Sequence, residues 1–398
     1  MEAIQNAIKA SKVHYCLDCG KCSSVCPISL INEDYSPRLL VQKALLESPE
    51  SVLEEELLWM CLGCEMCYEV CESRVHFSEF IRNVRIEAYR HGKEGVWAHN
   101  GRMQSIMRMM ASPNLKQDRL DWITRDLKVK MYPTNSTTQQ LNNSTELIYF
   151  VGCLPYFDAF FTNLELNTLN IAKSTIKILN HLGIEPVLMP DEKCCGHDLL
   201  WTGDIENFKK LAHHNIEGIK RTGVKKIVFS CPEGHQTFKN EYPKYMGGLD
   251  LEVIHISEII AEKLPELRFG TSKRKTRKPE KVTYQDPCSL GRIGGIYEQP
   301  RKIMNAIGVE LTEMPKNRKN ATCCGTSGWM NCGIYSKQIQ LARLKEAKST
   351  GADLLITSCP KCQIHFKCAM NNEDTPHEAK IEIQDLTISI ASELDKNV

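Results

Sequence analysis

Nineteen cysteines constrain this 398-residue chain more than any other feature of its sequence. Eight lie from Cys16 to Cys71, none lies between residues 72 and 152, and eleven lie from Cys153 onward. The first residues lack the charged-then-apolar layout of an export signal, so we expect a reducing compartment. In that setting thiols serve as metal ligands or redox groups rather than as disulfides. The pattern therefore predicts a protein organised around several inorganic centres.

The overall composition argues against several broad classes of protein. Apolar residues make up 42% of the chain and charged residues 25%, with a formal net charge of +1. Such a balance gives no electrostatic reason to expect a nucleic-acid partner. No apolar run approaches the ~18 residues that a membrane-spanning helix requires. We expect a cytoplasmic protein, or one held at the inner face of a membrane through a partner.

Cysteines and turn residues together suggest where the domains begin and end. Apolar residues between 77 and 90 recur on one helix face, and Ser36-Pro37 is a typical helix start, so the first part is expected to be helical. A turn-rich stretch around Pro133 follows it. The expected units are a cluster-binding domain over 1–110, a connector over 111–146, α/β domains over 147–271 and 282–398, and a solvated basic linker over 272–281.

Beyond residue 146 the sequence indicates two copies of one α/β domain. Short β-branched runs alternate with helical patterns, which is typical of parallel βαβ layers. The expected strands of the first copy lie over 147–151, 186–189, 226–229 and 251–254, and the expected helices over 168–182 and 204–221. Residues 223–232 align with 351–360 at an offset of 128, and 251–264 with 381–394 at an offset of 130. Near-constant offsets predict an internal duplication.

Two complete four-cysteine runs in the first domain indicate iron–sulfur clusters. Cys16, Cys19, Cys22 and Cys26-Pro27 have the C-x2-C-x2-C-x3-C-P spacing that binds a cubane [4Fe-4S] cluster. The second run is Cys61, Cys64, Cys67 and Cys71, with Glu72 in place of proline. The fourth cysteine of each run points to the neighbouring cluster. We therefore predict cluster one on Cys16, Cys19, Cys22 and Cys71, and cluster two on Cys61, Cys64, Cys67 and Cys26. Two structural zinc sites are the alternative.

Each α/β copy carries a further cysteine set in loops that follow expected strands. The first copy contains Cys153, Cys194, Cys195 and Cys231, and the second contains Cys288, Cys323, Cys324, Cys359 and Cys362. Such loops meet at the carboxyl edge of a parallel sheet, so thiolates from three loops can converge on one centre. Adjacent cysteines suit a cluster of unusual shape. The spacing alone predicts a multi-thiolate metal site in each copy.

Taken together, these motifs resemble the heterodisulfide reductase family. The Cys-Cys-Gly and Cys-Pro motifs, with 286–292 and 294–301, are similar to the CCG domain of its B subunit. The first domain resembles the α-helical ferredoxin type of the C subunit, so the chain resembles the D subunit, a fusion of C and B. The resemblance implies an α-helical ferredoxin domain followed by two Rossmann-like CCG domains. It also implies a catalytic noncubane [4Fe-4S] cluster on Cys288, Cys323, Cys324, Cys359 and Cys362, beside two cubanes.

One position departs from the family pattern. Gly234 stands where the fifth cysteine of the first copy is expected. The other four, Cys153, Cys194, Cys195 and Cys231, can hold a noncubane cluster, a cubane, zinc or nothing. His197 and His235 are candidate replacement ligands or proton donors, against the alternative of ordinary loop histidines.

For several other residues near the motifs, the sequence indicates only an expected contact or an expected burial. Arg292 is a candidate contact either for an anionic substrate tail or for an internal carboxylate. Cys332 and Cys368 fall outside every motif and are expected to be buried, inert thiols. Met103, Ile106, Met107 and Met110 form an apolar stripe that we assign to the core rather than to a docking face.

The function implied by the resemblance is the reduction of a small disulfide. Electrons would enter the first domain from a flavoprotein or b-type cytochrome partner and reach the last cysteine set. There a disulfide of the coenzyme M–coenzyme B heterodisulfide type would be cleaved, one electron at a time.

Two alternatives remain open. A non-catalytic electron-transfer subunit would instead serve a flavin-dependent 2-hydroxy acid or glycerol-3-phosphate dehydrogenase, as in iron–sulfur subunits that share this layout. No G-x-G-x-x-G fingerprint appears, so the flavin would then lie in another subunit. A zinc-dependent binding protein is the other alternative.

Overall fold

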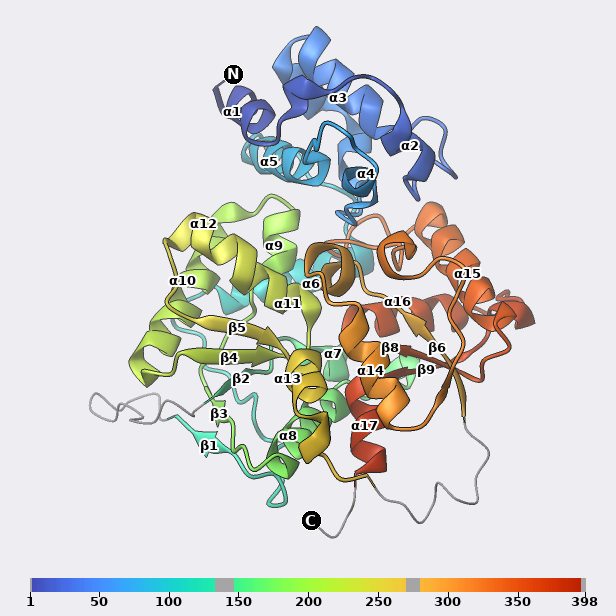
Figure 1. Ribbon diagram of the computed structural model, residues 1–398. Helices are drawn as coiled ribbons and strands as arrows, with labels where there is room; N and C mark the ends of the chain where they lie inside the picture. The colour runs from blue at the N-terminus through green and yellow to red at the C-terminus, as the bar shows by residue number, and fades with distance from the viewer. Residues whose placement is uncertain (1, 133–146, 270–279, 395–398) are drawn as a thin grey trace.

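The computed structural model describes residues 2–132, 147–269 and 280–394. A helical N-terminal part lies at one end of the molecule, and two α/β parts lie side by side beneath it (Figure 1). The α/β parts are mixed layers of helices on two parallel sheets. Both the helical first part and the parallel sheets agree with the sequence pattern.

The N-terminal part consists of short helices joined by turns. Helix α5 covers the predicted residues 77–90, and its Phe80, Ile81 and Val84 are fully buried. Ser36 caps α3, since its Oγ accepts a hydrogen bond of 3.3 Å from the backbone N–H of Leu39. The helices are α1 Glu2–Ala10, α2 Lys21–Val25, α3 Pro37–Leu46, α4 Met66–Glu69, α5 Phe77–Arg90 and α6 Arg102–Met110. The methionine stripe of α6 packs into the core, as expected.

The first α/β part contains a five-stranded parallel sheet in the order β1-β3-β2-β4-β5. Its strands are β1 Lys130–Met131, β2 Ile148–Phe150, β3 Val187–Leu188, β4 Lys226–Phe229 and β5 Glu252–His255. Its helices are α7 Leu154–Phe160, α8 Leu169–His181, α9 His197–Trp201, α10 Ile205–Thr222, α11 Pro232–Gln236, α12 Tyr242–Met246 and α13 Ile256–Glu262. Strand β1 belongs to the expected connector, so that stretch supplies an edge strand to this sheet. The turn residues from Pro133 to Ser144 lie outside the described residues.

The second α/β part repeats this arrangement with four strands. Its strands are β6 Lys281–Gln285, β7 Glu310–Leu311, β8 Leu354–Thr357 and β9 Glu382–Asp385. Its helices are α14 Glu298–Ala306, α15 Ile334–Ser349, α16 Pro360–Met370 and α17 Leu386–Glu393. The order β7-β6-β8-β9 matches β3-β2-β4-β5, as the internal duplication predicts. Most of the expected basic linker lies outside the described residues.

Reciprocal contacts relate the two repeats by an approximate two-fold axis. Helix α8 of the first repeat packs on α17 of the second, and α14 of the second packs on α13 of the first. Because α8 corresponds to α14 and α13 to α17, the interface is made twice from the same pair of surfaces. Apolar residues of both sheets share one core across this interface. No helix within the described ranges has both the length and the apolar character needed to cross a membrane.

Candidate metal centres

The two cysteine motifs of the N-terminal part fold into loops of the same shape. The residue before the second cysteine has positive φ in both loops, Asp18 at 55° and Gly63 at 60°. The residue after it is also left-handed, Gly20 at 77° and Glu65 at 61°. This backbone curls around the cysteines, and the N–H of Gly63 lies 3.4 Å from Cys61 Sγ. Each loop then enters a short helix, α2 or α4, that carries the third cysteine.

These loops place the eight cysteines in two neighbouring pockets. We call them the first motif pocket, lined by Cys16, Cys19, Cys22, Cys67 and Cys71, and the second motif pocket, lined by Cys26, Cys61, Cys64 and Cys67. Each pocket contains the first three cysteines of one run and the last cysteine of the other, and Cys67 lines both pockets. This placement allows the crossed ligation predicted for two cubanes. Four sulfur donors around a pocket fit a [4Fe-4S] cluster. Burial raises the pKa of Cys26 to about 12, so this thiol needs a bound metal to become a thiolate.

The five cysteines of the second repeat converge in what we call the second-repeat site. Cys288, Cys323-Cys324 and Cys359 lie in the loops after β6, β7 and β8, and Cys362 lies in α16. Their thiols interact in an unbroken series, from Cys288 through Cys323, Cys324 and Cys362 to Cys359. Hydrogen bonds from the Cys323 and Cys362 thiols lower the pKa of Cys324 to about 6. All but Cys323 line a pocket that also has a polar wall. The donor set fits an iron–sulfur centre with five thiolates.

The first repeat brings its four cysteines together at the equivalent place, the first-repeat site. Cys153 Sγ lies 3.4 Å from Cys194 Sγ, and Cys195 and Cys231 line the same pocket. A Cβ atom at Gly234 would lie 4.0 Å from Cys195 Sγ and 3.2 Å from the Phe229 ring. Residue 234 therefore occupies the place of Cys362, and the first repeat offers four thiols where the second offers five. Four sulfur donors fit a cluster or a zinc ion equally well.

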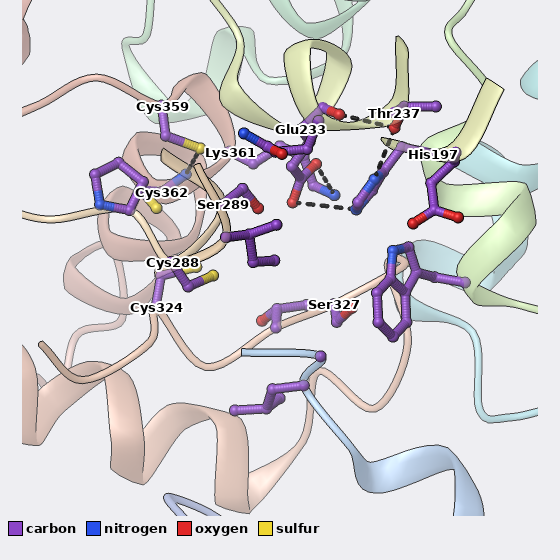
Figure 2. Close-up of a pocket in the computed structure, with 18 of the residues that line it drawn as sticks. His197, Glu233, Thr237, Cys288, Ser289, Cys324, Ser327, Cys359, Lys361 and Cys362 are labelled. Atoms are coloured by element: carbon purple, nitrogen blue, oxygen red, sulfur yellow. Dashed lines mark hydrogen bonds and ion pairs between the residues drawn. The ribbon is translucent and has the colours of Figure 1, made fainter. Parts of the chain in front are cut away.

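An ion pair separates the two repeat sites. Lys361 Nζ lies 2.7 Å from Glu233 Oε2 and 2.6 Å from Asp198 Oδ1. Glu233 and Lys361 hold the same position in the two Cys-Pro motifs, so their contact lies near the approximate two-fold axis. Figure 2 shows the second-repeat cysteines on one side, His197 on the other, and Glu233 with Lys361 between them. His197, Glu233 and Lys361 line the pockets of both repeat sites.

Three possible metal ligands lie around the same ion pair, and Lys361 occupies the position that a metal ion would take among them. Donor atoms of His197, Asp198 and Glu233 lie within 4.8 Å of one another. The Lys361 ammonium contacts both carboxylates and supplies the positive charge that a metal would otherwise bring. His197 also bonds Thr237 Oγ1 through Nδ1, at 3.1 Å, and burial lowers the pKa of His197.

Arg292 links the second motif pocket to the second-repeat site. Its Nε donates to the carbonyl oxygen of Cys64 at 2.6 Å, and Nη1 donates to the carbonyls of Lys319 and Ala321 at 2.8 and 2.7 Å. The Cys64 side chain packs in the same apolar cluster as Cys323 and Cys324. The arginine therefore bonds backbone carbonyls and has no carboxylate partner among the described residues.

Some features of the sites were not expected from the sequence. The cysteine spacing does not point to Glu233 and Lys361, although these residues stand at equivalent positions inside the two Cys-Pro motifs. His235 is fully buried against Phe229 and His255 and lines neither repeat pocket. Cys332 is exposed, so the expectation of a buried thiol is wrong there. Cys368 is partly buried against the core.

Comparison with known proteins covers all of these sites. Residues 147–239 and 282–367 match the family model of the cysteine-rich domain CCG, and residues 12–75 match that of a 4Fe-4S dicluster domain. The D subunit of dihydromethanophenazine:CoB–CoM heterodisulfide reductase from Methanosarcina acetivorans is 30% identical, over 98% of this chain and 96% of the relative. The B subunit of fumarate reductase (CoM/CoB) from Methanothermobacter marburgensis is 27% identical, over 91% and 69%. EtfAB:quinone oxidoreductase of Syntrophomonas wolfei is 28% identical, over 87% and 54%.

Proposed function

Because the chain belongs to the family of the heterodisulfide reductase D subunit, we propose that it is an iron–sulfur oxidoreductase subunit that reduces a small disulfide. Cubane clusters would be bound in the first and second motif pockets. A noncubane [4Fe-4S] cluster would be bound by the second-repeat site, within two Rossmann-like CCG domains that follow an α-helical ferredoxin domain. The disulfide would be of the CoB–CoM heterodisulfide type that the relative's name describes.

One observation carries this proposal. Five thiols from three loops and a helix meet at the second-repeat site, and four of them line a pocket together with polar side chains. When bound, such a cluster supplies single electrons and an iron that can bind sulfur. The polar wall of the pocket, with Ser289, Thr237 and Ser327, supplies hydroxyl groups for the rest of the molecule.

The order of the sites supports electron entry at the N-terminal part. Cys19 of the first motif pocket is exposed, and the neighbouring Leu17 is 69% exposed. The second motif pocket adjoins the first, because Cys67 lines both. Cys64 then packs beside Cys323 and Cys324. A flavoprotein or b-type cytochrome partner would therefore donate electrons at the first motif pocket, in the cytoplasm or at the inner face of a membrane.

The ion pair at the axis favours a reaction at one site. Lys361, with its side chain 3% exposed, and Glu233 stand between the first-repeat and second-repeat sites. A substrate in the pocket of Figure 2 therefore reaches Cys288, Cys324, Cys359 and Cys362 without displacing a buried salt bridge. The first-repeat site, with Gly234, would hold a cluster or zinc that the reaction does not need.

Low-temperature EPR of the oxidised protein tests the proposal. Addition of a small thiol is expected to produce a new paramagnetic signal in the wild type, because the thiolate binds at the second-repeat site. The Cys362→Ala variant should lose this signal and keep the spectra of the reduced cubanes. The Cys368→Ala variant removes a cysteine outside every site and should behave as the wild type does.

Iron analysis accompanies that experiment. About 12 irons per chain, four for each of three clusters, are expected in the wild type, or about 16 if the first-repeat site holds a cluster as well. A wild type with intact clusters and no thiol-dependent signal would contradict the proposal. Zinc in place of iron would contradict it too.

A second candidate is an electron conduit without catalysis of its own. The similarity to EtfAB:quinone oxidoreductase favours it, since that relative's name describes electron transfer to quinone. The chain would then pass electrons from a flavin-dependent dehydrogenase partner to another acceptor. Co-purification with such a flavoprotein, together with an EPR spectrum indifferent to thiols, is the result that this candidate predicts.

A further inference from the structure

The two repeat sites differ in the residues that end the strands next to them. In the first repeat β2 ends at Phe150 and β4 ends at Phe229, and these two residues pair across the sheet. In the second repeat the equivalent pair, at the ends of β6 and β8, is Gln285 and Thr357. Each strand end lies two or three residues before a cysteine of its site. The same two strand positions therefore precede the thiols in both repeats.

Aromatic rings occupy these positions in the first repeat. The ring centroids of Phe150 and Phe229 lie 5.2 Å apart, and the Phe238 ring packs on both at 4.9 Å. All three side chains are buried, and Phe150 and Phe229 line the first-repeat pocket. Because protein interiors are close-packed, a ring held by two other rings has little room to move.

Polar side chains occupy the same positions in the second repeat. The Thr357 hydroxyl donates a hydrogen bond of 3.3 Å to the carbonyl oxygen of Gln285, and the Gln285 side chain accepts one of 2.6 Å from Nε of Arg343. Threonine is smaller than phenylalanine, so the equivalent place on the following helix α16 can carry a side chain. Cys362 stands there, and its thiol interacts with that of Cys324.

The Phe229 ring crowds the place of a fifth thiol in the first repeat. A Cβ atom at Gly234 would lie 3.2 Å from Cδ1 of Phe229, which is closer than ordinary van der Waals contact. The same atom would lie 4.0 Å from the sulfur of Cys195, the counterpart of Cys324. A cysteine introduced at position 234 would therefore lie beside the equivalent thiol, but it would have to displace the ring.

The rest of the first-repeat pocket is apolar on the side away from His197 and the ion pairs of Lys361. Val151, Leu154 and Phe157 line it there. The second-repeat pocket instead presents the hydroxyl groups of Thr237, Ser289, Thr326 and Ser327. A molecule with polar arms would lose hydrogen bonds to water in the apolar pocket without replacing them, which is unfavourable.

We propose that Phe229 and Gly234 restrict the first-repeat site to a closed centre, which takes four protein thiolates and no incoming sulfur ligand. The second-repeat site has Thr357 and Cys362 at the same two positions, and it keeps both the fifth thiol and the polar pocket. These two positions thus decide which copy of the duplicated domain binds substrate. The inference rests on the proposed function only in taking the five-thiol site as the one that binds a substrate sulfur.

Transfer of the second repeat's pair of residues into the first repeat tests this assignment. In the Cys362→Ala background neither repeat has five thiols, so 2-mercaptoethanol should produce no new EPR signal in the oxidised, cluster-loaded chain. Addition of Phe229→Thr together with Gly234→Cys should restore the signal at the first repeat, to at least about half of the wild-type spin count. Gly234→Cys alone should restore at most about a tenth of it, because the ring still crowds the new side chain.

The matched control combines Phe157→Thr with Gly234→Cys in the same background. It removes another buried ring of the same pocket, one that is not among the groups nearest to position 234. This control should restore no more signal than Gly234→Cys alone. Circular dichroism and the EPR spectra of the reduced cubanes report whether each variant has folded.

A further variant tests the native arrangement without a redesigned site. Cys231→Ala removes a thiol of the first-repeat site, so the thiol-dependent signal per folded chain should stay within about twofold of the wild-type signal. Cys359→Ala, at the equivalent place of the second repeat, should abolish the signal.

Mössbauer spectroscopy of iron-57-loaded protein gives a readout that requires no thiol. The spectral component that Cys362→Ala removes should return when Phe229→Thr and Gly234→Cys are added together, and it should not return in the control.

The results that would overturn the inference are specific. They are equal recovery with Gly234→Cys alone, no recovery with the pair, a Mössbauer spectrum unchanged by Cys362→Ala, and loss of the thiol-dependent signal in Cys231→Ala. If the wild type gave no thiol-dependent signal, disulfide reduction would fall, and the Mössbauer comparison would still decide whether the first-repeat site is closed.

Discussion

Arg292 lies between the second motif pocket and the second-repeat site, so it is the residue best placed to influence electron transfer between them. Its side chain touches backbone carbonyls of both the Cys64 loop and the 319–321 turn, and its Nη2 has no hydrogen-bond partner among the described residues. Its guanidinium interacts electrostatically with the sulfur positions of Cys64, Cys288 and Cys323. Arg85 similarly donates to the carbonyl of Cys61 at 2.9 Å. A buried guanidinium group, that of Arg85, and a partly buried one, that of Arg292, therefore flank the second motif pocket.

A change at Arg292 should alter reduction potentials. Arg292→Gln removes a positive charge beside two of the proposed cluster sites, which makes reduction of a cluster bound there less favourable. We expect the midpoint potential of at least one cluster to fall by on the order of 50 mV. Potentiometric titration followed by EPR measures this shift.

Arg292→Lys is the matched control for that experiment. It keeps the charge but cannot bond three carbonyls in a fork, so its potentials should stay near those of the wild type while its stability falls. Equal potentials in Arg292→Gln and the wild type would show that the arginine acts only as a structural link.

At the scale of the helices, the last strand of each repeat ends in a cap for the next helix. Asp385 caps α17 and accepts a hydrogen bond of 2.8 Å from the N–H of Thr387. His255 stands at the equivalent place before α13 and accepts one of 3.3 Å from the N–H of Ser257. Both side chains are 1% exposed. Burial raises the pKa of Asp385 to about 7 and lowers the pKa of His255 to about 3, so both caps are neutral near pH 6.

Asp385 should give the folded protein a characteristic pH dependence. Its folded pKa of about 7 lies above the unfolded value of about 3.9, so the folded state binds more protons between these limits. Stability from this group is therefore present at low pH and is lost as the pH rises toward 7, at a slope of up to about 1.4 kcal/mol per pH unit.

Asp385→Asn provides the comparison. The amide keeps an acceptor for Thr387 and does not titrate, so the variant should gain stability relative to the wild type from pH 5 to pH 7. Urea unfolding at several pH values measures the difference, in which the acid sensitivity of the clusters cancels. A difference that does not change with pH would mean that Asp385 is ionised throughout.

At the scale of the whole molecule, the N-terminal part packs tightly against the first repeat. A Cβ atom at Gly63 would lie 2.6 Å from the Trp201 ring of α9, and Gly63 has a φ of +60°. Arg85 adds a hydrogen bond of 3.3 Å to the carbonyl of Trp201. The loop of the second motif pocket is thus held against the wall of the second-repeat pocket.

Gly63→Ala should loosen this junction. Alanine is disfavoured at positive φ by about 1–2 kcal/mol, and contact with Trp201 should add about 1–3 kcal/mol to the loss of stability. Gly20→Ala is the control, since Gly20 also has positive φ but a Cβ there meets no atom within 4 Å. Urea unfolding of the cluster-loaded proteins measures both. Equal losses of unfolding free energy in the two variants would show that the Trp201 ring moves away from the new methyl group without a loss of stability.

The cysteine sequence determined that the two N-terminal motifs lie together, that the α/β domain is duplicated and that three loops converge in each repeat. These features depend on spacing within a tight loop or on a regular order of strands and helices, and both are local. The capped start of α3 and the span of α5 were predictable for the same reason.

Only the tertiary structure decided how the four sites lie relative to one another. The approximate two-fold axis brings Glu233 and Lys361 into contact across 128 residues of sequence, and Arg292 reaches Cys64 across 228. Neither contact leaves a periodic signal, because each depends on how separately folded layers dock. The ion pairs of Lys361 with Asp198 and Glu233 also follow from that docking, since these groups meet only when the two repeats are packed together.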